Sequence, residues 1–456
     1  MSRRPHGRRV AALALATVAE LGCVTGLRPP GESASDTTDS TGGSASATDG
    51  TGDASGSVGG SGSGATTSDT SATATGGDPP LPPLGACELP PAEPAAIVIT
   101  TTDFSTGAVS VLELGPTPRL TTDVALGTPD AIPYPAPDGR VVVVHRFGWD
   151  YLDVLDPRDG WRSLANVRIE GPAPGVAANP HAIAFDRGGR AWVTLYGAAE
   201  VQALALPAAQ PRARVDLRPF ADGDGLPEVS LAVVCGERLY VGVQRLDRRT
   251  IPWGEAGPDV LVAIDPRRGE VLDLDPSTAA PDGVVLQGRS ARQLRADPRD
   301  PSGTRLFALT DGVELVDLAA ATAAWVVRPE QLAARGYGGP QQHLLPQAFD
   351  IDAAGATLWL TIYRPDFSGI DVLRIPLAAP EAASRVVPEL ELDGVERTIE
   401  LVGDVLVVGS RASQRPGVWL IDTGAQPPAP LTAAPLSTGL PPYAFVGIAA
   451  APRSPP

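Results

Sequence analysis

The chain has 456 residues and a formal net charge of −17, with 53 acidic side chains against 36 basic ones. It contains no lysine, so every fixed positive side chain is an arginine, which excludes Schiff-base and lysine general-base chemistry. An acidic chain with a pI near 4.7 repels nucleic-acid phosphates at long range, so we expect no nucleic-acid partner.

The first 22 residues have the pattern of an export signal. Four arginines precede an apolar segment, residues 10–18, that is too short to span a bilayer. Leu21-Gly22-Cys23 resembles a bacterial lipobox, although Glu20 stands where that motif has an apolar residue. We therefore predict a signal peptide at residues 1–22 and a lipid on Cys23, with ordinary signal cleavage nearby as the alternative.

Residues 23–86 are predicted to be a lipid-anchored, disordered linker. From Gly31 to Asp78 almost every residue is Gly, Ser, Thr, Asp or Ala, which cannot bury enough apolar area to offset chain entropy. A stiffer proline-rich stretch then leads into the folded part. We expect an exported protein on the outer membrane or cell surface, or in the periplasm if it is not lipidated, that meets the membrane through its lipid anchor only.

Cys87 and Cys235 remain as an even pair in an oxidising compartment if Cys23 carries a lipid. A disulfide between them would pin the proline-rich lead against the folded part. A buried, unpaired Cys235 is the alternative, and the spacing does not choose between the two.

From Ala95 onward the chain repeats with a period of about 50 residues, the scale of propeller blades. Each repeat has an apolar strand, a turn rich in Gly and Asp, a second strand rich in Val, and a third strand that often ends in Asp or Pro. PHAIAFDRGG, RAWVTLY and EVQALALP form one such set. These segments alternate with period 2 and are rich in β-branched residues, which is typical of strands.

The two ends of the repeat region complete each other. The region opens with AAIVITTTD, which matches a second strand, and ends with PPYAFVGIAAAP, which matches a first strand. Seven first strands and seven second strands result. We predict an all-β fold at residues 87–452, a seven-bladed β-propeller closed by N- and C-terminal strands and preceded by a disordered tether, because closure leaves no exposed sheet edge.

The third-strand pattern V-x-V-I/L-D-P/T-x-x-G, as in DVLVAIDPRRG, resembles the YVTN-type propeller repeats of bacteria and, more loosely, NHL-type repeats. VDLRPFADGDGLPEVSLAVVCGERLYVGVQRLD is also similar to a blade found in bacterial lipoproteins with a Ser/Thr/Gly tether. The resemblance covers residues 95–451. It implies the propeller fold and leaves the function open, because such propellers serve as binding scaffolds and as enzymes.

The first strand of each propeller blade lies nearest the axis, so residues at first-strand starts should ring the mouth of the central channel. Convergent polar groups in a concavity are typical of a ligand site. The alternative is that these positions are polar because loops face water. Alignment on His181 gives seven such residues, none of them aliphatic: Asp130, His181, Glu228, Arg292, Gln347, Arg397 and Tyr443.

Second-strand ends add further polar and basic side chains to the same face. Guanidinium groups bind carboxylates and phosphates through paired hydrogen bonds, so an Arg-rich face suits an anionic ligand. The alternative is that each arginine pairs with an acidic residue of its own blade, for instance Arg364 with Asp366. The added residues are His145, Arg146, Gln244, Arg245, Tyr363, Arg364 and Arg411.

The sequence does not demand a metal. Asp222, Asp224 and Glu228 offer oxygen ligands for calcium but lack the full EF-hand spacing, so we prefer a solvated Asp-Gly turn. Asp130, His181 and Glu228 form a second set, for a transition metal, without a close ligand pair. We expect no cofactor, with calcium as the alternative.

No HExxH, CxxC, P-loop or nucleophile-elbow motif occurs in the chain, so we assign no catalytic residue. We interpret the protein as a monomeric binding or scaffold module whose Arg-rich channel-mouth face takes an anionic small molecule, a polysaccharide or a protein of the cell envelope. One alternative is a propeller hydrolase or lyase with its active site at the channel mouth and His181 as general base or metal ligand. A purely structural envelope protein is the other.

Overall fold

The computed structural model describes residues 80–91, 93–249, 254–255, 257–278, 282–337, 346–366, 368–394 and 397–449. The predicted signal peptide, the lipidation site Cys23 and the linker as far as residue 79 lie outside these residues. No helix in the described ranges is long and apolar enough to cross a membrane.

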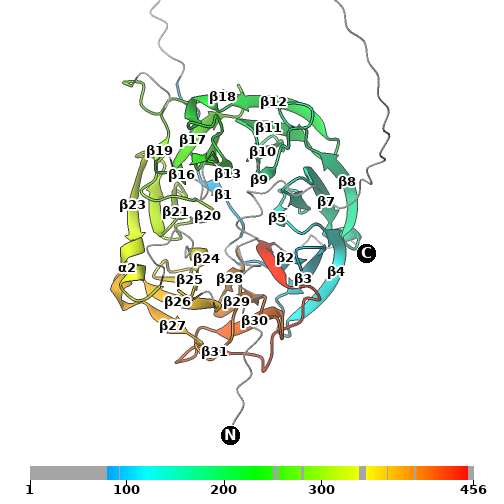
Figure 1. Ribbon diagram of the computed structural model, residues 1–456, viewed down its shortest axis with the longest axis vertical. Coiled ribbons are helices and arrows are strands. Elements are labelled where there is room, and N and C mark those ends of the chain that lie inside the picture. Colours follow the sequence, from blue (N-terminus) through cyan, green and yellow to red (C-terminus); the bar gives the residue numbers. More distant parts are fainter. Residues whose placement is uncertain are drawn as a thin grey trace, which may run out of the picture. The chain divides into compact units, whose positions relative to one another are not determined.

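Seven antiparallel sheets are arranged in a ring about a central axis, which confirms the predicted seven-bladed β-propeller (Figure 1). Each sheet is named below by its innermost strand. The β32 sheet has the order β32 (Pro442–Ile448), β2 (Ala96–Thr102), β3 (Gly107–Glu113) and β4 (Arg119–Gly127). The β5 sheet has β5 (Ala131–Pro135), β6 (Val141–His145), β7 (Tyr151–Asp156) and β8 (Arg162–Arg168), and the β9 sheet has β9 (Pro180–Phe185), β10 (Ala191–Leu195), β11 (Glu200–Ala205) and β12 (Gln210–Asp216).

The other four sheets continue the ring. The β13 sheet has β13 (Val229–Cys235), β14 (Arg238–Val243), β17 (Val260–Asp265) and β18 (Glu270–Val271), with β1 (Cys87–Glu88) added to β13 and β19 (Val284–Val285) added to β17. The β20 sheet has β20 (Gln293–Ala296), β21 (Arg305–Leu309), β22 (Val313–Asp317) and β23 (Thr322–Val327). The β24 sheet has β24 (Pro346–Ile351), β25 (Thr357–Tyr363), β26 (Ile370–Pro376) and β27 (Ser384–Val386), and the β28 sheet has β28 (Ile399–Val402), β29 (Val405–Ser410), β30 (Gly417–Asp422) and β31 (Ala429–Pro430).

Short elements decorate the loops. Strands β15 (Leu246–Asp247) and β16 (Gly254–Glu255) form a two-stranded ribbon. Helix α2 covers Pro329–Ala333, and single 3₁₀ turns cover Pro157–Asp159, Arg218–Phe220 and Pro380–Ala382.

The ring closes where the sequence predicted. Strand β32 pairs antiparallel with β2, with Ile97 opposite Gly447, Val98 opposite Val446 and Ile99 opposite Phe445. The C-terminal strand therefore supplies the innermost strand of the sheet that the N-terminal part of the propeller begins. Closure leaves this inner edge hydrogen-bonded rather than exposed.

The apolar pattern explains how the blades pack. All five residues of β6 (VVVVH) are buried, because both faces of this strand are covered by neighbouring sheets. Val142 and Val144 of β6 belong to the same core cluster as Ile183 of β9 and Val193 of β10. The outermost strand β4 instead mixes exposed and half-buried positions. The hydrophobic core thus lies between neighbouring blades. Side chains of the innermost strands that do not join this core line the central channel.

Residues 81–91, called the strap below, fix the N-terminal lead to the β13 sheet. Strand β1 pairs with β13, with Cys87 opposite Cys235 and Glu88 opposite Val234. Cys87 and Cys235 form a disulfide with an S–S distance of 2.01 Å, which is one of the two alternatives that the spacing left open. Arg238 Nε also donates to Pro82 O at 2.7 Å.

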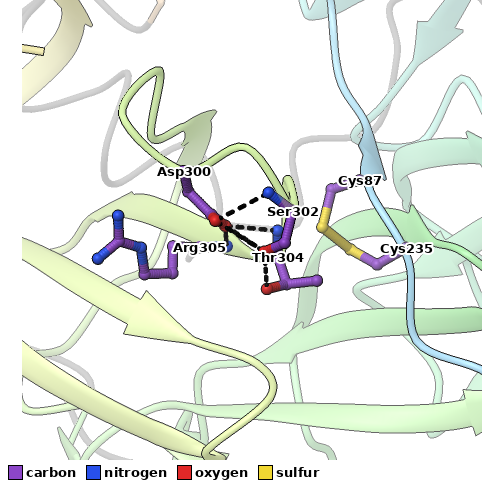
Figure 2. The surroundings of a disulfide bond; sticks show 6 residues. All are labelled: Cys87, Cys235, Asp300, Ser302, Thr304 and Arg305. Atoms are coloured by element: carbon purple, nitrogen blue, oxygen red, sulfur yellow. Dashed lines mark hydrogen bonds between the residues drawn. A yellow bond between two sulfur atoms is a disulfide. The ribbon is translucent and has the colours of Figure 1, made fainter.

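The strap is also held by the β20 sheet. Cys87 N donates to Gly303 O at 2.9 Å. Figure 2 shows the loop that presents this carbonyl, in which the Asp300 carboxylate accepts from the amides of Ser302, Thr304 and Arg305. Burial opposes ionisation of Asp300, but the hydrogen bond from the Ser302 hydroxyl, together with those from the three amides, outweighs it and lowers the pKa of Asp300 to about 2. The acceptor loop is therefore stiffened by a carboxylate that stays ionised.

The strap reaches one end of the channel. Strand β1 lies on the β13 sheet, whereas the next strand, β2, belongs to the β32 sheet three places around the ring. Glu88, Leu89, Pro90 and Pro91 line a cavity in the channel. The strap therefore forms part of the wall of the channel at the end opposite the first-strand starts.

Candidate functional site

Four side chains meet at the first-strand starts and are called the mouth cluster: Asp130, Arg146, His181 and Tyr443. Arg146 is only 4% exposed and lies at the centre. Its Nε donates to Asp130 Oδ1 at 2.7 Å, its Nη2 donates to Tyr443 Oη at 2.9 Å, and its Nη1 lies 2.9 Å from His181 Nε2. Tyr443 Oη donates to Asp130 Oδ1 at 2.9 Å. Three sheets thus contribute to one network.

The hydrogen bonds of His181 define its protonation. A guanidinium can only donate, so His181 Nε2 accepts from Arg146. His181 Nδ1 lies 3.0 Å from Ser230 O, which can only accept, so Nδ1 carries the proton. The ring is therefore neutral and both of its nitrogens are engaged. It also stacks on Tyr196, with ring centroids 4.7 Å apart.

The strand starts are not aligned as the repeat predicted. Asp130 O accepts from Arg146 N at 2.9 Å, and Glu228 O accepts from Gln244 N at 3.3 Å. The equivalent bond in the β9 sheet runs from Tyr196 N to Asn179 O at 2.9 Å. Asn179, rather than His181, is thus the counterpart of Asp130 and Glu228. The register shift in the β9 sheet, which inserts an extra residue near the start of β9, accounts for the displacement of His181.

Most of the predicted arginines are engaged with neighbours. Arg364, directly after β25, places its Nε 2.8 Å from Asp371 Oδ1 of β26, so it pairs within its own blade as the alternative expected, with Asp371 rather than Asp366 as the ion-pair partner. Arg411 donates to the carbonyls of Pro442 and Thr102 and stacks over Phe104, and burial lowers its pKa.

Arg292 and Arg245 lie at the same face. Arg292 Nε donates to Ser290 O at 3.1 Å. Arg245 is half-buried, and its Nε has no hydrogen-bond partner among the described residues. Neither guanidinium has an ion pair within the described part of the chain.

The remaining predicted site residues have structural partners. His145 is buried with Nδ1 2.9 Å from Thr128 Oγ1, and burial lowers its pKa to about 3, so it stays neutral. Gln244 accepts from Tyr196 Oη at 2.8 Å, and Tyr363 Oη donates to Gly394 O at 2.7 Å. Gln347 is buried near the start of β24.

Two of the candidate calcium ligands, Asp224 and Glu228, contact Arg248 instead of being free to hold a cation. Arg248 Nε lies 2.8 Å from Glu228 Oε1, and Arg248 N donates to Asp224 Oδ2 at 2.9 Å. Burial raises the pKa of Glu228 to about 8, and burial also raises the pKa of Asp222. Within the ranges that the structure describes, no group of three or more His, Cys, Asp or Glu side chains is placed to hold a metal ion.

A cavity of about 570 Å³ lies in the channel below the mouth cluster, within the size range of small-molecule sites. Its lining includes the exposed Pro137 and Asp138, so it opens to solvent at the end where first strands turn into second strands. The strap lines it as well. Arg397, two residues before the start of β28, lines the cavity too. The inner strands contribute Pro133, Tyr134, Ala182, Ile183, Leu231, Gln293, Leu294, Arg295, Glu400, Phe445 and Val446.

Arg397 separates this cavity from the mouth cluster. Its Nη1 donates to Tyr134 Oη at 2.8 Å and its Nη2 donates to Arg292 O at 2.9 Å. Tyr134 Oη in turn donates to His181 O at 3.1 Å. Tyr134 belongs to the β5 sheet and Arg292 precedes the β20 sheet, and neither sheet neighbours that of β28. The Arg397 side chain therefore reaches across the channel, and both of its partners are neutral oxygens.

An ionic group that the sequence analysis missed lies deeper in the channel. Arg295 Nη2 lies 2.5 Å from Glu400 Oε2, and Arg295 Nε lies 3.4 Å from Asp350 Oδ1. Asp350 Oδ2 also accepts from Leu401 N at 2.7 Å. Burial raises the pKa of Glu400 to about 7 and raises that of Asp350. The available signal was a charged residue inside each of three otherwise uncharged first strands.

Comparison with known proteins places the fold. No protein-family model matches the chain, and no curated protein sequence matches it. Solved structures do. A putative 6-phosphogluconolactonase from Bacteroides fragilis has 12% identity and a TM-score of 0.53, covering 77% of this chain and 96% of that one. The periplasmic gluconolactonase of Pseudomonas aeruginosa has 14% identity and a TM-score of 0.50, covering 77% and 99%. At these identities the likeness shows a shared propeller fold alone.

Proposed function

We propose that this chain is an exported, lipid-anchored binding propeller that holds a small anionic ligand in the channel cavity, with the acid group of the ligand against Arg397. The supporting observation is that Arg397 lines the cavity and donates to two neutral oxygens, Tyr134 Oη and Arg292 O. Among the residues that the structure describes, Arg397 has no carboxylate partner. An unpaired guanidinium held in a partly desolvated channel attracts an anion more strongly than a paired one.

The proposal moves the ligand from the mouth into the channel. At the mouth, Arg146 and Arg364 already have carboxylate partners, Asp130 and Asp371, so an anion there would have to displace an internal pair. Arg245 and Arg292 have no ion pair among the described residues, but neither of them lines the channel cavity, which could hold the rest of a ligand. The cavity also offers apolar walls for the rest of a small ligand, from Tyr134 and Phe445. Specificity in such sites comes from few polar groups on an apolar wall.

The geometry favours binding over the hydrolase or lyase alternative. A general base at the mouth needs a lone pair that can reach a substrate proton. His181 Nε2 accepts from Arg146 and Nδ1 donates to Ser230 O, so its lone pair is engaged. His145 is buried and does not reach solvent.

Isothermal titration of the purified chain with tartrate, gluconate and sulfate tests the proposal. We expect at least one of these anions to bind, and Arg397→Gln to weaken that binding about tenfold or more, because a charge-assisted hydrogen bond is lost. Erythritol, a four-carbon polyol without the carboxylates of tartrate, should bind less tightly than tartrate. The matched control is Arg158→Gln, which alters an exposed arginine paired with Asp156 outside the channel.

Binding of none of the three anions, or equal affinity of the wild type and Arg397→Gln, would contradict the proposal. Circular dichroism and thermal unfolding of both variants establish that each is folded, so a loss of affinity reports on the site.

A further inference from the structure

We infer that Glu400 is a second ligand-binding residue of the channel cavity and that it takes up a proton when the anion binds. The inference rests on the proposed function. Glu400 and Arg397 both line the cavity, although residues three apart in a regular strand point to opposite faces. Arg397 has φ of 39°, a left-handed conformation that breaks the alternation just before β28 and turns both side chains to the channel.

The charges that face Glu400 come from several elements. Strand β20 contributes Arg295 and strand β24 contributes Asp350, which form the ion-pair set with Glu400. Four more charged residues line the same cavity: Glu88, Asp138, Arg140 and Arg397. The adjoining strand β32 presents Phe445 and Gly447 to it, which do not titrate. In the ion-pair set around Glu400, one guanidinium group thus faces two carboxyl groups, those of Asp350 and of Glu400 itself.

Glu400 is the carboxyl group of this ion-pair set whose protonation can change. Burial raises the pKa of Glu88 as well, but that residue lies exposed on the strap. Asp350 is fixed by the backbone amide of Leu401 in addition to Arg295. Within the described chain, Glu400 accepts hydrogen bonds from the two terminal nitrogens of one guanidinium, Arg295 Nη1 and Nη2. Its side chain is 2% exposed, so water does not stabilise its ionised form.

Protonation of Glu400 follows from charge balance. Burial raises its pKa to about 7, so the group is partly protonated at neutral pH already. An anion in the same cavity makes the ionised form less favourable still, and the pKa rises further. The protonated carboxyl group gains an O–H donor that can hydrogen-bond to a ligand oxygen. Binding should therefore be tighter at lower pH across this range, by linkage.

Titration calorimetry at pH 6, 7 and 8 with the tightest-binding of tartrate, gluconate and sulfate tests the inference, because all three stay ionised over this range. We expect affinity about fivefold higher at pH 6 than at pH 8. At pH 7 the heat should differ between two buffers of different ionisation enthalpy, which reports uptake of a fraction of a proton. Glu400→Gln, which always carries a donor, should bind at pH 8 about as tightly as the wild type does at pH 6.

The matched control is Asp153→Asn, because burial raises the pKa of Asp153 too but this residue lies in β7, outside the cavity lining. It should keep the pH dependence. Wild-type binding that does not change with pH, or a pH dependence retained by Glu400→Gln, would overturn the inference while leaving the proposed function standing. Binding of no anion at any pH would overturn both.

Discussion

The mouth cluster and the channel cavity both contain arginine and acidic side chains, but these charges are paired differently in the two regions. At the mouth, Arg146 faces Asp130 and its remaining donors meet Tyr443 and the neutral His181. In the cavity, by contrast, Arg295 is shared by two carboxylates, and Arg397 has neutral partners.

This difference indicates which charged residues stabilise the fold and which are available to a ligand. A satisfied network fixes the side chains that form it and leaves little for a ligand to gain. Charges that remain unbalanced in a desolvated channel can be balanced by a ligand or a proton. We therefore interpret the mouth cluster as a network that holds the blades together, and we propose the cavity as the place where the anionic ligand binds.

The largest effect should follow from Arg295→Met, which removes the cation of the buried ionic group and leaves Asp350 and Glu400 without it. We expect a loss of about 3–5 kcal/mol in the free energy of unfolding at pH 8, because two buried carboxylates would be uncompensated. Urea unfolding measures this.

The pH dependence of the same variant has a defined sign. Folding raises the pKa of Glu400 and Asp350, so their ionisation costs stability, and this cost grows as the pH rises from the unfolded pKa through the folded one. At pH 5 both carboxyl groups would be largely protonated in the variant, and the loss should shrink. An equal loss at pH 5 and pH 8 would show that packing, not charge, carries the effect.

A smaller effect is expected at the mouth from Tyr443→Phe. The variant keeps the ring, which packs edge-on to Phe104, but loses the hydroxyl that joins Asp130 and Arg146. We expect a loss of about 1 kcal/mol in the free energy of unfolding and unchanged affinity for the anions of the calorimetric panel. If Tyr443→Phe weakened anion binding as much as Arg397→Gln, the separation of the two regions would be wrong.

The fold could be predicted because its signals are local and repeated. Alternation in segments such as RAWVTLY marks strands, and the unmatched AAIVITTTD and PPYAFVGIAAAP mark the closure that β2 and β32 make. The same periodicity predicted that strand starts gather at one end, and the structure brings Asp130, Arg146, His181 and Tyr443 together there.

The site could be predicted only in part, because its details depend on the register and on distances across the channel. An inserted residue at the start of β9 makes Asn179 the counterpart of Asp130, which repeat alignment does not reveal. Arg295 and Glu400 are 105 residues apart and meet across the axis, so no local pattern joins them. The sequence could not decide whether the disulfide forms for the same reason, since Cys87 and Cys235 are separated by 148 residues.

A crystal structure of the propeller with the tightest-binding of tartrate, gluconate and sulfate tests the assignment of recognition to the cavity most directly. We predict the anion inside the cavity, with one of its oxygens about 3 Å from a nitrogen of the Arg397 guanidinium. An anion bound at Arg146 in the mouth cluster, or on the outer surface with the cavity unoccupied, would contradict it.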